Sequence, residues 1–418
     1  MRTVTYKMLP VVIPNVAVRS YLEHHSKVEM LVPDRTSSIY VDEQPTDNPI
    51  ENNGQPRKGG GGGGLLGQVV PSGVHRIGAD PLTLPFTGIG VGVAVADTGV
   101  DLDHPDLIPQ ATCYKVTDLL DCSTGQPVSF ASCDDDHGHG THVAGTIAAR
   151  DNSIGTVGVA SGANIYSVKV VDQTGHACDS WIIDGLNWIA RNANSVSPPI
   201  RVVNMSLGRS GTLNDNPAFR FAVQYLYNMG ISVTAAAGNS DSVEVTSIVP
   251  AGYPEVMAVA STTVNSGTND GSSKCGQIFQ GFPIIQGDTA SFFTTDGRFD
   301  PATRRGVTIS APGDNREDVV GSDTECFLVT RGLLSLWPGG GTEEASGTSM
   351  ATPLVSGVLA LMWAKALFAG GTLAPEDARA KIRSSADRIN VAPLDNLSLI
   401  YTFDGEREGV LSAPGALQ

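Results

Sequence analysis

The chain has 418 residues, and its 43 acidic and 27 basic side chains give a formal net charge of −16. This acidic excess disfavours nucleic acid or an anionic membrane surface as a partner. With 17% charged residues, 48 glycines and 25 prolines, the composition predicts a loop-rich globular protein long enough for one large core. No uninterrupted apolar run approaches the roughly 20 residues of a membrane span, so we expect no membrane contact.

The N-terminal part differs from the rest of the chain. The pattern predicts strands with prolines over Tyr6–Val18, a short helix over Arg19–Lys27 and another strand over Val28–Val32. Residues 42–64 are polar and end in six glycines, which predicts a flexible linker. Cleavage at Arg57-Lys58 within it is conceivable, as at any exposed linker bond.

Short β-rich segments alternate with helical patterns over most of the remaining chain. Helices are expected over Trp181–Asn192 and Pro217–Met229. This alternation predicts an α/β fold with three layers, in which helices cover both faces of a mostly parallel sheet. A ligand crevice should lie beyond the carboxyl ends of the strands. The predicted strands are Gly92–Ala96, Ile165–Val171, Val202–Met205, Ser232–Ala236, Val256–Ala260 and Val307–Ser310.

Asp97 ends the first of these strands and begins an Asp-Thr-Gly sequence. A buried strand would deliver its carboxylate to the crevice. Half of an aspartic-protease dyad is the alternative, but that chemistry needs two carboxylates sharing a proton. No second Asp-Thr-Gly or Asp-Ser-Gly occurs in the chain.

Histidines alternate with small residues over His137–Thr146, where the chain turns helical. Zinc ligation is one interpretation of His137, His139 and His142. However, no His-Glu-x-x-His sequence is present, and His137 and His139 are too close in sequence to share a helix face. A general base is the other interpretation, because imidazole changes charge near neutral pH.

Ser349 lies two residues after Gly347 and five before the start of an apolar run, Leu354–Phe368, that predicts a buried helix. The unpaired N–H groups at a helix start suit a serine that attacks a carbonyl and stabilises the oxyanion. The alternative is an ordinary N-cap. Asp97, His139 and Ser349 follow one another in the Asp, His, Ser order of subtilisin, which differs from the orders of other serine hydrolases.

With these motifs the chain resembles the subtilisin-like serine proteases, or subtilases, over about residues 68–387. The resemblance implies that Asp97 orients the histidine, that His139 is the general base and that Ser349 is the nucleophile. The tract ending in Asn239 resembles the oxyanion segment, so the Asn239 amide would be the donor there. The family also implies an inhibitor-type propeptide, and residues 1–41 resemble its second half.

The same resemblance assigns substrate-binding positions to two edges of the crevice. An extended peptide is expected to add as a strand between these edges. The positions are Ser206, Leu207 and Gly208 on one edge, Gly175, His176 and Ala177 on the other, and Gly238 beside the oxyanion donor.

A calcium site is also implied. Its oxygens would come from the side chains of Gln68, Asp106 and Asn152 and from the backbone of Arg150, Ile154 and Thr156, a set that suits this hard cation. A hydrogen-bonded turn is the alternative for that loop. The acidic run Asp134–Asp136 favours a solvated loop over a second metal site.

Six cysteines suit an oxidising compartment, although six allow about 15 pairings. The family favours a bridge between the regions of Cys133 and Cys178, which would leave Cys113–Cys122 and Cys275–Cys326. Free buried thiols are the alternative for some of them.

The resulting expectation is a secreted, monomeric serine endopeptidase that acts on proteins or peptides and is inhibited by its own propeptide. Residues 1–41 would be the partial propeptide, 42–64 the linker, 65–405 the catalytic domain and 406–418 a C-terminal tail. The mature enzyme is expected to start between Arg57-Lys58 and Gln68. A non-catalytic peptide-binding relative of the proteases is the second hypothesis.

Overall fold

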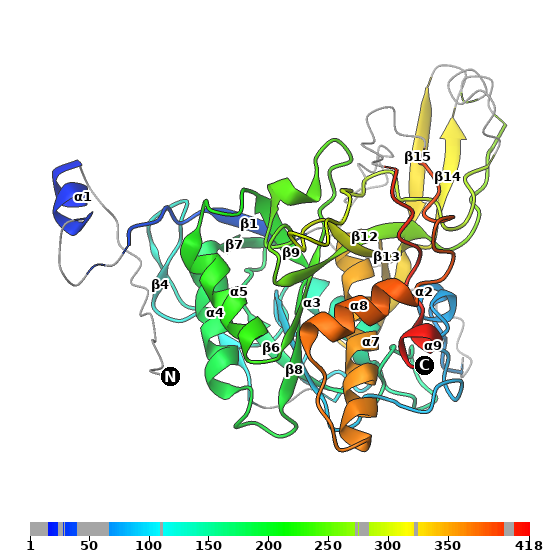
Figure 1. Ribbon diagram of the computed structural model, residues 1–418, viewed down its shortest axis with the longest axis horizontal. Helices are drawn as coiled ribbons and strands as arrows, with labels where there is room; N and C mark the ends of the chain where they lie inside the picture. Colours follow the sequence, from blue (N-terminus) through cyan, green and yellow to red (C-terminus); the bar gives the residue numbers. More distant parts are fainter. Residues whose placement is uncertain are drawn as a thin grey trace.

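A computed structural model describes residues 16–23, 28, 30–39, 67–108, 112–271, 275, 284–321, 325–396 and 405–418. The predicted linker, 42–64, and most of the first predicted strand segment lie outside these residues. The described chain is built around one large sheet with helices on both sides (Figure 1).

The main sheet has seven strands, all parallel to their neighbours. The six strands predicted from the sequence are all present in it, and the short β3 is added at one edge. Side chains alternate between the faces, so that Val93 and Val95 enter one core while Ala94 and Ala96 enter the other. In spatial order the strands are β13 (Val307–Asp314), β12 (Val256–Thr263), β10 (Ser232–Ala236), β8 (Ile200–Met205), β2 (Gly92–Asp97), β6 (Asn164–Lys169) and β3 (Tyr114–Lys115).

Helices cover both faces of this sheet, which confirms the predicted three-layer architecture. One core contains residues of α4 (Asp179–Asn192) and α5 (Pro217–Asn228), close to the predicted helical ranges. The other core contains residues of the remaining helices of the main body, which are α2 (Ser72–Arg76), α3 (His139–Ala148), α7 (Thr348–Phe368), α8 (Pro375–Ser384) and α9 (Ala413–Ala416).

Helix α7 runs through this second core and is apolar on all sides. By length and composition it is the one helix in the described part of the chain that could cross a membrane, and 78% of its most apolar 18-residue window is buried. Such burial is typical of a core helix in a globular protein. The helix is longer than the predicted Leu354–Phe368 because it begins at Thr348, but its apolar residues are interrupted by Ser356, Gly357 and Lys365.

The C-terminal residues contribute to the same core. Leu411, Ala413 and Ala416 are buried beside α7, and the Leu411 N–H donates to Ser310 O of β13 at 2.9 Å. The segment predicted as a tail, 406–418, thus includes residues that pack like the rest of the domain.

Three small hairpins lie outside the main sheet in the described residues. The sequence carries no interpretable motif over 314–344, and this stretch forms most of two hairpins. They are β14 (Arg316–Gly321) with β15 (Cys326–Arg331), and β16 (Leu333–Trp337) with β17 (Gly341–Ala345). A third joins β4 (Leu119–Leu120) to β5 (Pro127–Val128). A 3₁₀ turn, η1 (Val245–Ser247), precedes β11 (Ile248–Val249).

The N-terminal segment departs from the sequence prediction. Helix α1 (Val16–Glu23) begins three residues before the predicted one, and the described residues between 28 and 32 form no strand. A strand forms further on, at β1 (Thr36–Ile39). It lies antiparallel between β7 (His176–Cys178) and β9 (Leu207–Ser210), and β11 completes a four-stranded sheet. Pairing with these distant edges, and not local propensity, makes residues 36–39 a strand.

Three disulfides are formed, and two of the three predicted pairings are wrong. Cys275–Cys326 agrees with the prediction. The structure pairs Cys113 with Cys133 and Cys122 with Cys178, however, instead of Cys133 with Cys178 and Cys113 with Cys122. Strand β3 and the hydrogen bond from Ser167 Oγ to Cys133 O keep the first pair at the sheet edge. The β4–β5 hairpin carries Cys122 to β7.

Candidate active site

Asp97 and His139 form a buried hydrogen-bonded pair at the carboxyl edge of the sheet. Asp97 ends β2, is 0% exposed, and its Oδ1 lies 2.7 Å from His139 Nδ1. The Thr98 N–H also donates to Oδ1, at 2.7 Å. This contact fixes the ring so that Nε2 faces away from Asp97. Nε2 is buried and has no hydrogen-bond partner among the described residues, so it is available to a proton donor.

His139 is held by the start of α3, which a buried carboxylate organises. Asp135 Oδ1 accepts the N–H groups of His137 and Gly138 at 3.0 and 2.9 Å, and its Oδ2 accepts from Thr141 N at 2.9 Å. The carboxylate thus satisfies donors that a helix start leaves unpaired. The prediction of a solvated acidic loop is wrong for Asp135, because the turn into α3 buries this side chain.

Two further contacts near Asp97 were not anticipated from the sequence. Lys169, opposite Asp97 in the β2–β6 register, is buried and donates to Thr98 O and, at 2.5 Å, to Asp136 Oδ1. Trp337 of β16 packs against Gly138, where a Cβ would collide with its ring. Both contacts join segments far apart in the sequence, so no local pattern signals them.

Ser349 is the second residue of α7 and is completely buried. Its hydroxyl donates to Ser206 O at 3.0 Å, and the Ser206 hydroxyl donates back to Ser349 O at 2.9 Å. This reciprocal pair joins the start of α7 to the segment between β8 and β9. The structure therefore sets Ser349 beside one of the predicted substrate edges.

Asn239 follows β10 with its side-chain amide oriented by Thr348. Asn239 Oδ1 accepts from the Thr348 N–H at 3.0 Å and from its hydroxyl at 2.8 Å. The amide nitrogen, Nδ2, is buried and has no hydrogen-bond partner in the described part of the chain. An oriented, unsatisfied donor next to Ser349 is what oxyanion stabilisation requires. Gly238 adopts φ +117°, a left-handed conformation that favours glycine, at the turn before Asn239.

The histidines do not converge as metal ligands would. His142 Nε2 lies 3.0 Å from Leu333 O, and complete burial lowers the pKa of His142 to about 4. Within the described residues, the one His and Cys cluster with metal-like spacing is Cys122, His176 and Cys178, and its sulfurs are joined in a disulfide. The geometry favours the general-base interpretation of His139 over zinc ligation.

The residues predicted to hold calcium contact one another. The Gln68 side chain contacts the carbonyl oxygens of Arg150 and Thr156, the latter at 2.7 Å. Asp106 is buried, its Oδ1 has no hydrogen-bond partner in the described chain, and Oδ2 accepts from Thr156 N at 3.0 Å. Burial raises the pKa of Asp106, against the effect of its hydrogen bonds from Thr156 and Asn152.

This loop has the chemistry of a hard-cation site. An unpaired buried carboxylate oxygen among carbonyl oxygens is costly unless a cation balances it. The Ile154 N–H donates to Asn152 Oδ1 at 3.1 Å, while ligation by the Ile154 carbonyl stays a prediction. The residues therefore fit calcium.

The two predicted substrate edges enclose β1. Ser37 and Ser38 are paired with Ala177 and His176 on one side, and Ser38 and Ile39 with Gly208 and Leu207 on the other. The Ile39 N–H also donates to Gly175 O at 3.3 Å. The edges thus bind an extended segment of this chain in the antiparallel manner of strand addition.

A buried Asp–His pair, a serine at a helix start and an oriented amide donor are groups that a serine hydrolase uses, and here they lie on an α/β fold. The model of the family described as "Subtilase family" matches residues 88–406. The chain belongs to the subtilase family.

Individual relatives agree with this membership. The chain is 36% identical over 301 residues to Subtilisin E of Bacillus subtilis (strain 168), a match that covers 71% of this chain and 62% of the relative. Subtilisin of Bacillus pumilus is also 36% identical over 301 residues, with 71% and 86% covered. M-protease of Shouchella clausii (strain KSM-K16) is 35% identical, with 71% and 60% covered. The match with Subtilisin E thus spans less than two thirds of that relative.

Proposed function

We propose that the chain is a serine endopeptidase that hydrolyses peptide bonds through an acyl-enzyme intermediate. The observation that carries the proposal is the buried Asp97–His139 pair, whose free Nε2 can take up a proton. The Ser349 hydroxyl is a weak nucleophile at neutral pH and needs such a base. The names of the relatives, which are subtilisins and alkaline proteases, support the same activity.

The expected reaction begins when the Ser349 hydroxyl turns from Ser206 O towards His139. His139 Nε2 takes the proton while Ser349 Oγ bonds to the scissile carbonyl carbon, and Asp97 stabilises the resulting imidazolium. The Asn239 amide and the Ser349 backbone N–H would bind the oxyanion. His139 then returns the proton to the leaving amine. A water molecule releases the acyl group by the same route.

Calcium would serve stability in this proposal. When bound, it neutralises Asp106 and ties Gln68 to the loop around Arg150 and Thr156. Gln68 lies near the start of the described part of the catalytic domain, so the ion would fasten this part of the chain to the domain. Supporting it is the buried, unpaired Asp106 Oδ1.

The N-terminal residues would act as an intramolecular inhibitor. Strand β1 occupies the substrate edges in the manner of a bound peptide, so a substrate must displace it. Ile39 pairs with Leu207, so a peptide that continued this register by one residue would have that residue opposite Ser206, whose carbonyl Ser349 contacts. Self-cleavage in this register would therefore fall after Tyr40, upstream of the cut expected between residues 57 and 68.

We also propose that the enzyme is secreted, because the chain forms three disulfides and such bridges are typical of oxidising compartments. Monomeric behaviour stays a prediction.

A fluorophosphonate probe tests the activity. The probe should label the processed wild-type protein on Ser349, as located by mass spectrometry, and Ser349→Ala should not be labelled. A matched control is Ser356→Ala, which removes another buried hydroxyl of α7. Failure of the processed wild type to react would favour a peptide-binding protein without catalysis.

A further inference from the structure

The segment bound between β7 and β9 shows how this cleft treats side chains, and not only backbone. Thr36 and Ser38 are exposed, whereas Ser37 between them is 1% exposed. Alternation of this kind is expected for a strand that lies on a surface. Ser37 is therefore the residue that the cleft encloses, and its surroundings show what that position accepts.

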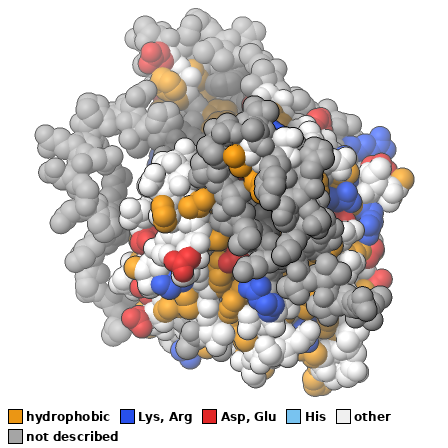
Figure 2. Space-filling model, turned by 90° about the vertical axis from the view of Figure 1, so that its left-hand side faces the viewer, with side chains coloured by type: hydrophobic (Ala, Val, Ile, Leu, Met, Phe, Trp, Pro, Cys, Tyr) orange, Lys and Arg blue, Asp and Glu red, His pale blue; other side chains and the backbone are white. Residues whose placement is uncertain are grey.

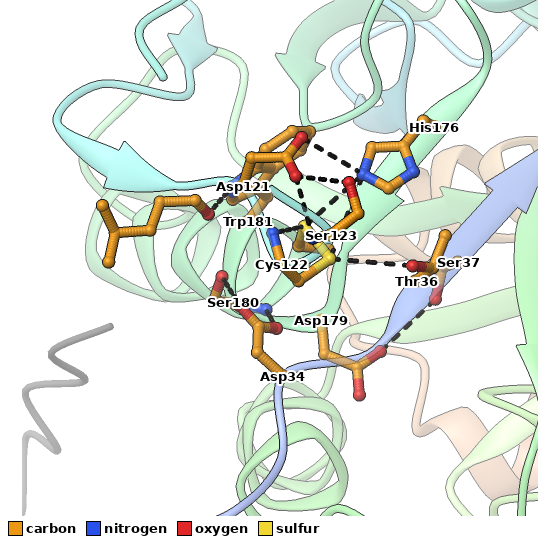
Figure 3. Close-up of a disulfide and its surroundings, with 12 residues drawn as sticks. Asp34, Thr36, Ser37, Asp121, Cys122, Ser123, His176, Asp179, Ser180 and Trp181 are labelled. Carbon is orange, nitrogen blue, oxygen red and sulfur yellow. Dashed lines mark hydrogen bonds and ion pairs between the residues drawn. A yellow bond between two sulfur atoms is a disulfide. The ribbon is translucent and has the colours of Figure 1, made fainter. Parts of the chain in front are cut away.

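The Ser37 hydroxyl meets a charged, fully hydrogen-bonded floor. It donates to Asp179 Oδ1 at 3.3 Å, and Asp179 is completely buried. Arg209 binds both oxygens of this carboxylate, at 2.9 and 2.6 Å, and Asn216 Nδ2 donates to Oδ2 at 2.7 Å. Figure 3 shows Asp179 directed at Ser37 from the start of α4. A hydroxyl can hydrogen-bond to this buried carboxylate. A large apolar side chain would instead pack against a buried ion pair and make no hydrogen bond to it.

Arg35 meets an acidic group on the same side of the cleft. Its guanidinium lies 3.1 Å from Asp215 Oδ2 and donates to Asp215 O at 2.8 Å. Burial alone would raise the pKa of Asp215, but hydrogen bonds and charge from Arg209, and the charge of Arg35, hold it below its usual value. Asp215 is therefore ionised at neutral pH and favours a basic residue two positions before Ser37.

Asp34 is placed at the start of α4. Its carboxylate accepts from the Ser180 N–H at 2.9 Å and from the Ser180 hydroxyl at 2.6 Å (Figure 3). Helix α4 has 14 residues, and its positive N-terminal end favours a negative charge there. Three of the six residues 34–39 thus have matched polar partners on the body of the protein.

The disulfide Cys122–Cys178 forms the wall on the other side of this segment. Thr36 Oγ1 lies 3.8 Å from Cys122 Sγ, and Cys178 faces Thr36 across the β1–β7 register. The bridge joins the β4–β5 hairpin to β7 and so attaches this hairpin to one edge of the cleft. Thr36 is exposed beyond this wall, which leaves its position open to many side chains.

We propose that this cleft selects peptides with the sequence Asp-Arg-x-Ser on the amino side of the cut, with the serine three residues before the residue that supplies the scissile carbonyl. Asp179, held by Arg209, binds the serine hydroxyl. Asp215 binds the arginine, and Ser180 at the start of α4 binds the aspartate. The inference rests on the proposed endopeptidase function. The inference assigns to that function a substrate class, namely peptides that resemble residues 34–39.

The test uses full-length protein after its own processing and a set of p-nitroanilide peptides. The parent peptide is Asp-Arg-Thr-Ser-Ser-Ile-Tyr, the sequence of residues 34–40. Changing the serine that corresponds to Ser37 to leucine should lower kcat/KM at least about tenfold, because a buried hydrogen bond to a charged group is lost. Changing the arginine that corresponds to Arg35 to alanine should lower it about two- to fivefold, as for a partly exposed ion pair.

A variant of the protein assigns the arginine effect to one residue. In the wild type, kcat/KM should be roughly two- to fivefold higher for the arginine peptide than for the alanine peptide. In Asp215→Asn this ratio should fall to about one. Asp184→Asn is the matched control, because this α4 carboxylate accepts from the Tyr114 hydroxyl and not from β1. The control should keep the wild-type ratio.

Two outcomes overturn the inference in distinguishable ways. Equal kcat/KM for all peptides, or an unchanged arginine-to-alanine ratio in Asp215→Asn, refutes the selection but leaves the endopeptidase function standing. No hydrolysis of any peptide by the processed wild type refutes both.

Discussion

The reaction centre and the substrate cleft differ in how the chain holds them. Asp97, His139 and Ser349 are each at most 1% exposed and lie at ends of elements that form the two cores. Strand β1 contributes one partly buried apolar contact, Ile39, and one buried serine, Ser37, while Thr36 and Ser38 are exposed. The chemistry thus depends on rigid packing, whereas the bound segment depends on edge pairing and a few polar anchors that another peptide could replace.

The coloured part of the face turned to the viewer in Figure 2 carries side chains of both charges. On the face seen in Figure 2, acidic and basic side chains are interspersed and do not gather into one basic patch. Mixed charges of this kind suit polar peptide recognition and give no long-range attraction for nucleic acid on that face.

Removing the oxyanion donor should affect the reaction centre most and the cleft least. Asn239→Ala is expected to lower kcat about a hundred- to a thousandfold with little change in KM, which is the range known for loss of the oxyanion-hole amide in subtilisin. Steady-state kinetics on one peptide measures both constants. A comparable rise in KM would place Asn239 in ground-state binding.

Removing the carboxylate that organises α3 should also damage the reaction centre. Asp135→Ala leaves several buried donors unpaired and loosens His139, so we expect kcat to fall roughly tenfold or more. The free energy of unfolding should fall by about 2 kcal/mol, as measured by denaturant titration. Asp134→Ala is the control, since Asp134 is exposed. Equal effects from both changes would show that the hydrogen bonds of Asp135 to the start of α3 have no special role.

Calcium removal should change stability without changing the cleft. A chelator is expected to lower the Tm by several degrees, and Asp106→Asn should lower it without chelator and abolish the further response. The reason is the loss of a ligand that binds only the folded state. Differential scanning calorimetry measures both. A wild-type Tm that does not change on addition of the chelator would contradict the calcium assignment.

A pH-dependent effect on stability is expected from a buried acid in the C-terminal segment. Burial, reinforced by the charge of Asp296, raises the pKa of Glu408 to about 8 from 4.5. Because the folded value is the higher one, this group's stabilisation is complete below pH 4.5 and is lost as pH rises through about 8.

Glu408→Gln removes this titration while keeping the oxygen that accepts from Ser310. As the pH rises between the two pKa values, the free energy of unfolding of the wild type should fall by about 1.4 kcal/mol per pH unit relative to that of the variant. Urea titrations at several pH values measure the difference. Parallel stability curves would show that Glu408 does not titrate in this range.

Local sequence patterns indicate the candidate catalytic residues because each of these residues lies in a segment with a pattern of its own. Asp97 ends an apolar strand, Ser349 begins an apolar helix, and each can be found from the segment that carries it. The fold followed in the same way, since alternating strand and helix patterns leave few topologies open.

Contacts between distant segments could not be predicted in this manner. Strand β1 has a weak Thr-Ser-Ser-Ile pattern and exists because β7 and β9 pair with it. The exchange of partners between Cys122 and Cys133 depends on where one hairpin lies. Asp135 resembled a solvated acid because the turn that buries it has no sequence signature.

The central claim is that Ser349 attacks a peptide bound between β7 and β9 in the register of β1. Incubating the full-length chain and measuring intact mass and N-terminal sequence tests it directly. The account predicts a cut after Tyr40, a new chain beginning at Val41, and no cut in Ser349→Ala. A wild-type chain that stays intact, or the same cut in Ser349→Ala, would contradict it.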